Sequence, residues 1–193
     1  MRDDPACDPE LLSRLRQGDD TAFREIYAAY RTKLYSFLLR LSGRRDLSED
    51  LCQEVWLHLV AGPPILQPGM PLGPWLYRVA RNTYINYLRS REYDADRTAE
   101  MTAIQFQPSP QADPLEELAE SEIQQRLLGE LARLPLLYRE CLLLVACAGL
   151  APQQAAGILD LPAATFRKRL SRAREMLAIR MGISKNHSDE VNS

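Results

Sequence analysis

Cysteine and histidine are both scarce in this sequence, which contains four and two of them in 193 residues. The cysteines form no CxxC pair, and the spacing of Cys141 and Cys147 would point them to different faces of a helix. So few thiols and imidazoles disfavour a zinc site. Buried or idle reduced thiols are the better interpretation of Cys7, Cys52, Cys141 and Cys147. We therefore expect no metal and no other cofactor.

Long apolar runs are missing as well, since none approaches the ~20 residues that a membrane-spanning helix needs. The N-terminal segment, MRDDPACDPE, lacks the charged and apolar regions of a signal peptide. We therefore expect a cytoplasmic protein that is not inserted in a membrane. The sequence also lacks a nucleophile with a matching base and a phosphate-cradling glycine loop, so we expect no enzymatic activity.

Acidic residues are absent from residues 61–91, which carry four arginines. Residues 92–125 have the opposite balance, −8, from nine acids and one arginine. Residues 163–181 are basic again, at +5, although the formal net charge of the whole chain is −2. A merely solvated surface would mix the two signs, so this segregation indicates that the chain binds a polyanion at two separate places.

Alternating strand patterns are missing too, and apolar residues instead recur at three-four spacing. This spacing predicts an all-α fold of two small helical domains joined by a flexible linker, with a helix-turn-helix in the C-terminal domain. Asp19 and Asp20 can cap the start of one long helix, which Gly43 should end, and Asp46 with Glu49 has capping-box spacing at the start of the next. The predicted boundaries are residues 1–92 for the first domain, 93–114 for an acidic, proline-containing linker, 115–181 for the second domain and 182–193 for a polar tail.

The second domain ends with a short helix from Pro152, a tight turn, DLP, and a basic helix over residues 163–181. This spacing is typical of a helix-turn-helix, whose second helix can enter the major groove of DNA. Phe166 and Leu170 fall on the inward face of the basic helix. The outward side chains that we expect to contact DNA are Thr165, Arg167, Lys168, Ser171, Arg172 and Arg174. A basic, solvated helix in an ordinary bundle is the alternative, which the turn and the clustered charge disfavour.

A predicted helix over residues 75–91 concentrates aromatic, amide and guanidinium groups. Its outward face should carry Trp75, Arg78, Asn82, Asn86 and Arg89. Aromatic rings can stack on unpaired bases at roughly 1–3 kcal/mol each, amides can bond base edges, and arginine can neutralise phosphate. The residues alone leave two interpretations of equal weight: a surface for unpaired bases, or an ordinary amphipathic helix whose tryptophan and tyrosines belong to the core.

Three segments taken together resemble one family closely. They are DLSEDLCQEVWLHL, WLYRVARNTYINYLR, and LPLLYRECLLL followed by LAPQQAAGILDLPAATFRKRLSRAREML. These segments look like successive hallmarks of the extracytoplasmic-function sigma factors of bacterial RNA polymerase, in family order and at family spacing, over about residues 20–181. The resemblance implies a protein that binds core RNA polymerase, directs it to specific promoters and promotes strand opening for transcription initiation.

The resemblance also implies what each domain does. The first domain would bind the clamp of the largest polymerase subunit and the minus-10 element, and the second would bind the flap of the second-largest subunit and the minus-35 element. An acidic helix face would meet the clamp through Glu49, Asp50, Gln53 and Glu54. The outward residues of the 75–91 helix would contact minus-10 DNA, where Asn82 matches a position that helps to shape a pocket for a flipped base. The outward residues of the basic helix would contact minus-35 DNA.

Further partners are implied by the family. Sigma factors of this group are usually held by an anti-sigma protein, often membrane-anchored, which would cover the surfaces that otherwise meet polymerase. The acidic linker would thread near the polymerase active-site channel and mimic nucleic acid, although a passive tether has equal weight from sequence. Several features depart from the family pattern: the loop 61–74 lacks the aromatic residue often found there, Ala151 stands where a capping Ser or Thr is common, residues 154–156 replace a frequent EIA, and Phe166 replaces a common Val.

Two other classes of protein remain as alternatives. An ordinary helix-turn-helix regulator would bind duplex operator DNA tightly by itself, whereas a sigma factor binds specifically only together with core polymerase. A helical adaptor without DNA binding would tolerate Arg167→Ala and Arg172→Ala in the last helix.

Overall fold

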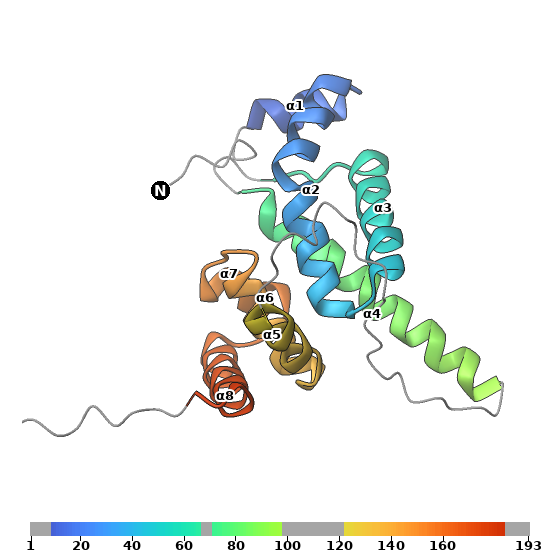
Figure 1. The fold of residues 1–193 in the computed structure, drawn as a ribbon. Coiled ribbons are helices and arrows are strands. Elements are labelled where there is room, and N and C mark those ends of the chain that lie inside the picture. Colours follow the sequence, from blue (N-terminus) through green and yellow to red (C-terminus); the bar gives the residue numbers. More distant parts are fainter. Residues whose placement is uncertain (1–8, 67–70, 98–121, 184–193) are drawn as a thin grey trace, which may run out of the picture.

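The computed structural model describes residues 9–66, 71–97 and 122–183, and within these ranges the chain forms eight helices and no strand (Figure 1). They are α1 (Pro9–Arg16), α2 (Asp20–Ser42), α3 (Arg45–Ala61), α4 (Gly73–Arg97), α5 (Glu122–Ala132), α6 (Leu136–Ala146), α7 (Pro152–Ile158) and α8 (Ala163–Met181). The all-α prediction is therefore confirmed. Since α4 runs to Arg97, the first residues of the predicted linker are helical, and the rest of the linker and most of the tail lie outside the described residues.

Caps at both ends of α2 follow the prediction from sequence. The Oδ1 atom of Asp19 accepts hydrogen bonds from the backbone N–H groups of Thr21 and Ala22, at 2.8 and 3.4 Å. Arg14 donates to the other carboxylate oxygen at 2.7 Å, and this bond is the main reason why the pKa of Asp19 lies below its usual value. At the far end Gly43 has a φ of 72°, a left-handed conformation that glycine adopts without strain.

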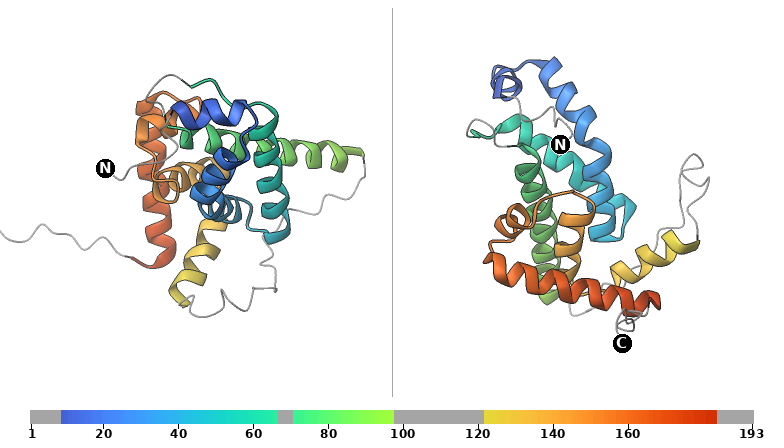
Figure 2. Two further views of the ribbon diagram at one scale, coloured as in Figure 1. Left: turned by 90° about the horizontal axis from the view of Figure 1, so that it is seen from above. Right: turned by 90° about the vertical axis from the view of Figure 1, so that its left-hand side faces the viewer.

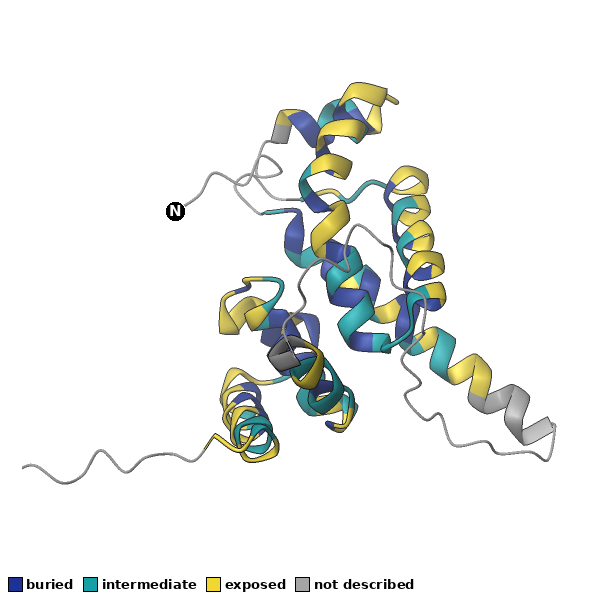
Figure 3. Cartoon of the chain, in the orientation of Figure 1, coloured by how far each residue is buried: buried dark blue, intermediate teal, exposed yellow. Residues whose placement is uncertain are grey.

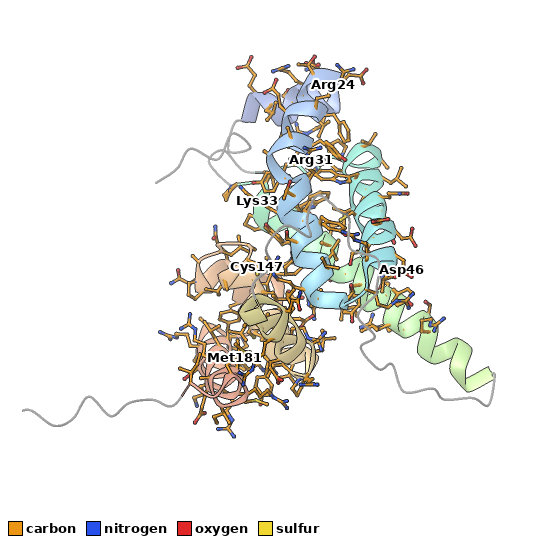
Figure 4. All side chains as sticks on the ribbon, in the orientation of Figure 1. Arg24, Arg31, Lys33, Asp46, Cys147 and Met181 are labelled. Carbon is orange, nitrogen blue, oxygen red and sulfur yellow. The ribbon has the colours of Figure 1, made fainter. Side chains whose placement is uncertain are left out.

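The start of α3 differs from the prediction. Arg44 occupies the N-cap position without a side-chain cap, so the capping box predicted from Asp46 and Glu49 is wrong. The Asp46 carboxylate instead forms an ion pair with the Arg44 guanidinium, which lowers the pKa of that carboxyl. Arg44 also donates to the Tyr87 hydroxyl at 3.3 Å, so it joins this end of α3, where Figure 4 labels Asp46, to α4.

Helices α1–α4 form what we call the N-terminal unit. Its core is built from the inward stripes of α2, α3 and α4, which are dark in Figure 3. The predicted stripe of α3 is buried throughout and consists of Leu47, Leu51, Val55 and Leu59. Phe37 of α2 meets Tyr77 of α4 edge to face, with 5.2 Å between ring centroids, so aromatic packing locks α4 onto α2.

Helices α5–α8 form what we call the C-terminal unit. The apolar run in α6 was predicted to be its buried centre, and Cys141, Leu143 and Leu144 are indeed buried. The inward face of α8 packs against α6 and α7, with Phe166 and Leu170 buried as predicted. No helix in the described ranges has the length and hydropathy required to cross a bilayer.

The two units pack directly against each other. Helix α2 contacts α5 and α6, and α4 contacts α7, as the two views of Figure 2 show for the green and orange helices. The buried apolar side chains of both units belong to one continuous cluster. Helix α7 contacts both α4 and α8, the two helices predicted to contact DNA.

Candidate nucleic-acid interface

The outward face of α8 carries the basic residues that the sequence predicts for DNA contact. The exposed side chains are Arg167, Lys168, Ser171, Arg172 and Arg174, while Thr165 in the first turn is half-buried. The Nη1 atom of Arg172 lies 2.8 Å from a Glu175 carboxylate oxygen, and both side chains are largely exposed. Because the opposite face of α8 is fixed in the core, the basic face can lie against the edge of a duplex groove.

The turn between α7 and α8 fixes the orientation of the basic helix. Pro152 stands in the first turn of α7, where its missing N–H costs no hydrogen bond. The side chain of Gln154 accepts a hydrogen bond from the Ala151 N–H at 3.0 Å, so this N–H is satisfied although alanine has no capping side chain. Asp160 in the turn has a φ of 51°, a left-handed conformation that Asp tolerates better than most residues.

A second candidate surface runs along α4. Arg78, Asn82, Asn86 and Arg89 are exposed at three- and four-residue spacing, so they lie along one side of the helix. Trp75 stands at the start of this row, and its ring is half-buried against the core. We call these five residues the α4 stripe. It presents amide and guanidinium groups over ~21 Å of helix, at ~1.5 Å per residue.

The tyrosines of α4 whose side chains are described belong to the core instead of the stripe. Tyr77 and Tyr84 are buried, and Tyr87 is half-buried beside Arg44. The second of the two interpretations left open by the sequence therefore holds for these rings. In the part of α4 whose side chains are described, Trp75 is the ring that reaches the stripe, so base stacking would depend on it.

The C-terminal unit covers part of the α4 stripe. The guanidinium of Arg78 donates to the carbonyl oxygen of Gly157 in α7 and lies 3.7 Å from the carboxylate of Asp160. One turn further, the Nε atom of Arg81 donates to Oε1 of Glu140 in α6 at 2.8 Å. Arg78, a predicted DNA contact, is thus held by the opposite unit.

Glu140 is a buried charge in this contact. Its side chain is 7% exposed, and desolvation raises the pKa of its carboxyl against the attraction of Arg81, Arg169 and Arg139. Burial likewise lowers the pKa of the Arg139 guanidinium. Arg139 donates a hydrogen bond to the carbonyl oxygen of Leu41 in the N-terminal unit at 2.7 Å. It also donates to the carbonyl oxygens of Ala132, the last residue of α5, and Leu134. The contact between the units is therefore charged, and its part around Glu140 is largely shielded from water, whereas the Arg78–Asp160 pair is exposed.

Sequence reasoning missed the pairing of Arg81 with Glu140. These residues are separated by 59 positions and fall in different predicted domains. One signal was present, namely a lone acid inside the apolar run LLYRECLLLVA. A carboxylate on a helix expected to be buried needs a cationic partner, because an unpaired buried charge is costly.

A third surface is the acidic face of α3. Its exposed residues include all four that the sequence assigns to polymerase contact, Glu49, Asp50, Gln53 and Glu54, and this outer side of α3 is yellow in Figure 3. Leu57 and Val60 extend the face with apolar surface, at 69% and 58% exposure. Acidic, amide and apolar groups together suit a protein partner that supplies arginine and apolar side chains.

The cysteines offer no reactive thiol among the described residues. Burial raises the pKa of Cys52 to about 12 and that of Cys141 to about 11, and it also raises the pKa of Cys147. Within the described ranges no group of His, Cys, Asp and Glu side chains could hold a metal ion. The three surfaces described above are made of amide, guanidinium, carboxylate and apolar groups.

Two family models match the chain, one in each unit. The model described as Sigma-70 region 2 matches residues 26–93, and the model described as Sigma-70, region 4 matches residues 124–177. The first match contains the acidic face of α3 and the α4 stripe. The second contains the helix-turn-helix and the basic face of α8.

Curated bacterial proteins are similar to the chain over most of their length. The ECF RNA polymerase sigma factor SigM of Bacillus subtilis is 32% identical over 153 residues, which cover 79% of this chain and 91% of SigM. The ECF RNA polymerase sigma factor EcfG of Rhodopseudomonas palustris is 32% identical over 148 residues, which cover 75% of this chain and 77% of EcfG. The ECF RNA polymerase sigma-E factor of Haemophilus influenzae is 28% identical over 180 residues, covering 88% of this chain and 93% of that factor.

Two solved structures have a similar fold. The sigma factor RpoE in complex with the anti-sigma factor NepR from Bartonella quintana superimposes with a TM-score of 0.71 at 22% identity, covering 84% of this chain and 98% of RpoE. CnrH in complex with the cytosolic domain of CnrY superimposes with a TM-score of 0.65 at 21% identity, covering 91% of this chain and 97% of CnrH. The likeness extends over both units.

Proposed function

The chain belongs to the extracytoplasmic-function sigma factors of the sigma-70 family, and from this premise we propose how its surfaces divide the work of promoter-specific initiation with RNA polymerase. Residues 1–92 bind core polymerase and the minus-10 element, and residues 115–181 bind the minus-35 element. Residues 93–114 link the two domains, and residues 182–193 form a tail. The observation that supports this assignment is that each unit presents one exposed helical row of side chains that can bond bases or phosphates, on α4 and on α8.

The basic face of α8 reads the minus-35 element as duplex. Arg167, Lys168 and Arg172 can donate to guanine edges in the major groove, where a good bidentate contact is worth about 1–3 kcal/mol of discrimination. Thr165 near the helix N-terminus can donate its hydroxyl to a phosphate. Ser171 and Arg174 complete the face and help to fix the register of the helix on the backbone.

The α4 stripe holds the minus-10 element after its strands separate. Asn82 and Asn86 can bond the edges of unpaired bases, and Trp75 can stack on one of them. Arg78 and Arg89 can neutralise the phosphates of the same strand. Because capture of single-stranded DNA shifts the equilibrium from closed to open promoter, strand opening is driven by binding free energy and needs no enzymatic activity in this chain.

The acidic face of α3 binds the clamp of the largest polymerase subunit through Glu49, Asp50, Gln53 and Glu54. Four exposed groups that accept hydrogen bonds would meet arginines of a partner helix, and the neighbouring apolar side chains would exclude water. The C-terminal unit binds the flap of the second-largest subunit. Holoenzyme formation places the protein in the cytoplasm, where transcription occurs.

An anti-sigma protein is the further partner that we expect. The solved relatives RpoE and CnrH are each in complex with another protein, NepR and the cytosolic domain of CnrY, and NepR is an anti-sigma factor. A membrane-anchored protein of this kind would occupy the surfaces that otherwise meet polymerase. A pull-down from cells that recovers core polymerase alone under all conditions would argue against such a partner.

Run-off transcription with purified core polymerase tests the proposal. Wild-type protein should start transcription at specific promoters, and Asn82→Ala should reduce the permanganate reactivity of unpaired thymines at the minus-10 element. Thr32→Ala, an exposed change on α2, is the control. Failure to associate with core polymerase, or no added DNA opening, would contradict the proposal.

The same assay separates the other classes of protein. A helix-turn-helix regulator would bind a duplex operator tightly without polymerase, which gel-shift titration of the free chain would detect. A helical adaptor would keep its activity after Arg167→Ala and Arg172→Ala, whereas a sigma factor would lose promoter selectivity.

A further inference from the structure

Lysine is rare in this chain, since only three of its 24 lysine and arginine residues are lysines. They are Lys33, Lys168 and Lys185, and the last lies outside the described residues. The two kinds of cation differ in chemistry. An arginine in a protein keeps its charge, whereas a lysine amine can be acylated and then becomes a neutral amide. A basic surface that holds one lysine among arginines therefore has one charge that such a reaction can remove.

Lys168 is the lysine of the basic face of α8. Its side chain is exposed, and so are those of Arg167 and Arg172. The residues three and four positions away on the helix are Ala164, Thr165, Ser171 and Arg172. None of these is an acid, so α8 offers the amine no carboxylate at the spacings where helical side chains meet. Glu175, the one acid among residues 163–181, lies 2.8 Å from Arg172.

The charge around Lys168 favours the approach of small anions. Residues 163–181 carry five arginines and Lys168 against one acid, a balance of +5. A concentration of one sign of charge raises the local concentration of counter-ions, whether they are DNA phosphates or small metabolites. An acyl phosphate is a doubly charged anion that is also an activated acyl donor, so the face that attracts DNA also draws this reagent to its amine.

Lys33 on α2, labelled in Figure 4, provides a natural comparison within the same chain. Its side chain is exposed, and its Nζ atom lies 5.5 Å from the centre of the Tyr30 ring, within the range of a cation–π interaction. The residues three and four positions from it are Ala29, Tyr30, Ser36 and Phe37, which include no arginine. Lys33 is thus an exposed amine without guanidinium groups at helical-neighbour spacing.

We propose that Lys168 is a site of Nε-acylation by acyl phosphates, and that this modification changes which minus-35 elements the protein selects. The ammonium group first loses a proton to water. The free amine then attacks the acyl carbon, so that an N–C bond forms and the C–O bond to the phosphoryl group breaks. The phosphate leaves with the electron pair of that bond and takes the second amine proton, which gives inorganic phosphate and a neutral amide.

The consequence for promoter choice rests on the proposed function of α8. An acylated Lys168 has no charge and a single N–H, so it loses the cationic contact with a guanine edge. Affinity for a promoter with guanine at that base pair should fall roughly 5- to 150-fold, and affinity for other promoters should fall less. The five arginines keep their charge, so the modified protein still binds DNA. Because bound DNA covers the amine, acylation acts on protein that is not engaged with a promoter.

Treatment of the full-length free chain with acetyl phosphate at low salt and mildly alkaline pH tests the site. Mass spectrometry of the peptides should show acetylation at Lys168 at least about fivefold faster than at Lys33. The difference should shrink at high salt, with the neutral donor N-hydroxysuccinimide acetate, and in Arg172→Gln, which removes a neighbouring guanidinium. Acetylation of Lys168 that is no faster than that of Lys33 would overturn the proposal.

Holoenzyme assays test the consequence. Chains acetylated at Lys168 or at Lys33 by genetic incorporation of acetyllysine are assembled with core polymerase and titrated on promoters with single base-pair changes. The first should lose the preference for guanine at one position, and the second should keep the wild-type preferences. Lys168→Arg keeps a cation that acetyl phosphate cannot acylate, so its preferences should be the same before and after treatment with that reagent.

The outcomes separate this proposal from the proposed function. A chain acetylated at Lys168 that selects promoters like wild type would overturn the regulatory consequence and leave the sigma-factor assignment untouched. Preferential acetylation of Lys168, together with no transcription by the unmodified or modified chain on core polymerase, would contradict the proposed function while the modification site stands. A change in promoter preference that acetylation at Lys33 reproduces would also overturn the proposal, since the effect would then come from net charge.

Discussion

Arg172 in the middle of α8 can contact bases at little free-energy cost, because it breaks only a weak ion pair to do so. In the free chain its guanidinium pairs with Glu175 at 2.8 Å, but both side chains are largely exposed, so the pair contributes little to stability and can yield to DNA. Arg172→Ala should weaken the specific promoter by about 1–3 kcal/mol, or roughly 5- to 150-fold. Holoenzyme titration on promoters with single base-pair changes measures this.

The control for that prediction is Arg180→Ala. Arg180 is an exposed arginine in the last turn of the same helix, outside the predicted reading face. Loss of a base contact should relax selectivity at one base pair, whereas loss of a phosphate contact should weaken all promoters alike. Equal effects of Arg172→Ala on every single-base variant would assign Arg172 to the backbone.

Cys141 should be inert in the folded protein. Burial raises the pKa of this thiol to about 11, so at pH 7.5 on the order of one molecule in 3,000 carries the reactive thiolate. Iodoacetamide should therefore label the peptide that contains Cys141 at least 100-fold more slowly in native protein than in urea, as followed by mass spectrometry. Equal labelling rates in the two conditions would mean that the thiol is accessible and open to redox chemistry.

At the scale of the helix, the N-cap of α2 gives a prediction with a definite pH dependence. The pKa of Asp19 is lowered below 3.8 in the folded state, chiefly by Arg14 and then by the cap bond from Thr21. Its stabilising contribution is therefore complete above the unfolded pKa and is lost as the pH falls through the folded pKa. Asp19→Ala should lower the urea midpoint at neutral pH, and the gap to wild type should close below pH 3.8.

Two substitutions isolate the cause of that effect. Asp20→Ala changes the same residue type one position later, where it is not the cap, and should shift the midpoint less. Asp19→Asn keeps an oxygen that can accept the cap bonds but loses the attraction to Arg14, so it should fall between wild type and Asp19→Ala. A gap to wild type that widens on acidification would contradict the predicted sign.

Local signals were enough to predict most of the helices, because caps and periodic apolar residues act within a few turns of chain. Asp19 and Pro152 start helices where the sequence placed them, and Gly43 ends one. The start of α3 could not be predicted in this way, since Arg44 competes for Asp46 and is held by Tyr87 from another helix. The same holds for the candidate surfaces. The periodicity of the sequence predicts which side chains of α8 are exposed, but it does not predict that Arg78 contacts α7.

At the scale of the whole molecule, the sequence could not predict that the two units pack together. Glu140 of α6 bonds to Arg81, and Arg139 bonds to the carbonyl oxygen of Leu41. Contacts of this kind join distant segments and produce no repeating pattern in the sequence. What the sequence does fix is the length of chain between the units. Residues 98–121 can span at most ~80 Å when extended at ~3.3 Å per residue, which corresponds to roughly 23 base pairs of duplex at ~3.4 Å each.

This limited reach makes the length of the linker a quantity that can be tested. Deletion of residues 101–110 removes ~33 Å of reach, so one chain should no longer contact both elements of a promoter with normal spacing. Run-off transcription should fall on such promoters and recover in part on templates whose spacer is shortened by several base pairs. Replacement of the same residues by Gly and Ser keeps the reach, so it should retain the wild-type spacing preference.

The replacement also distinguishes the two roles considered for the linker. A passive tether works with any flexible sequence of equal length, so initiation by the Gly/Ser chain would match wild type. Residues 101–110 contain no acid, so the role of charge is tested by also replacing Glu100, Asp113, Glu116 and Glu117 with Ser. A linker whose acids mimic nucleic acid in the polymerase channel would then lose activity at every spacing. A deletion that left the spacing preference unchanged would show that the two units do not hold the promoter jointly.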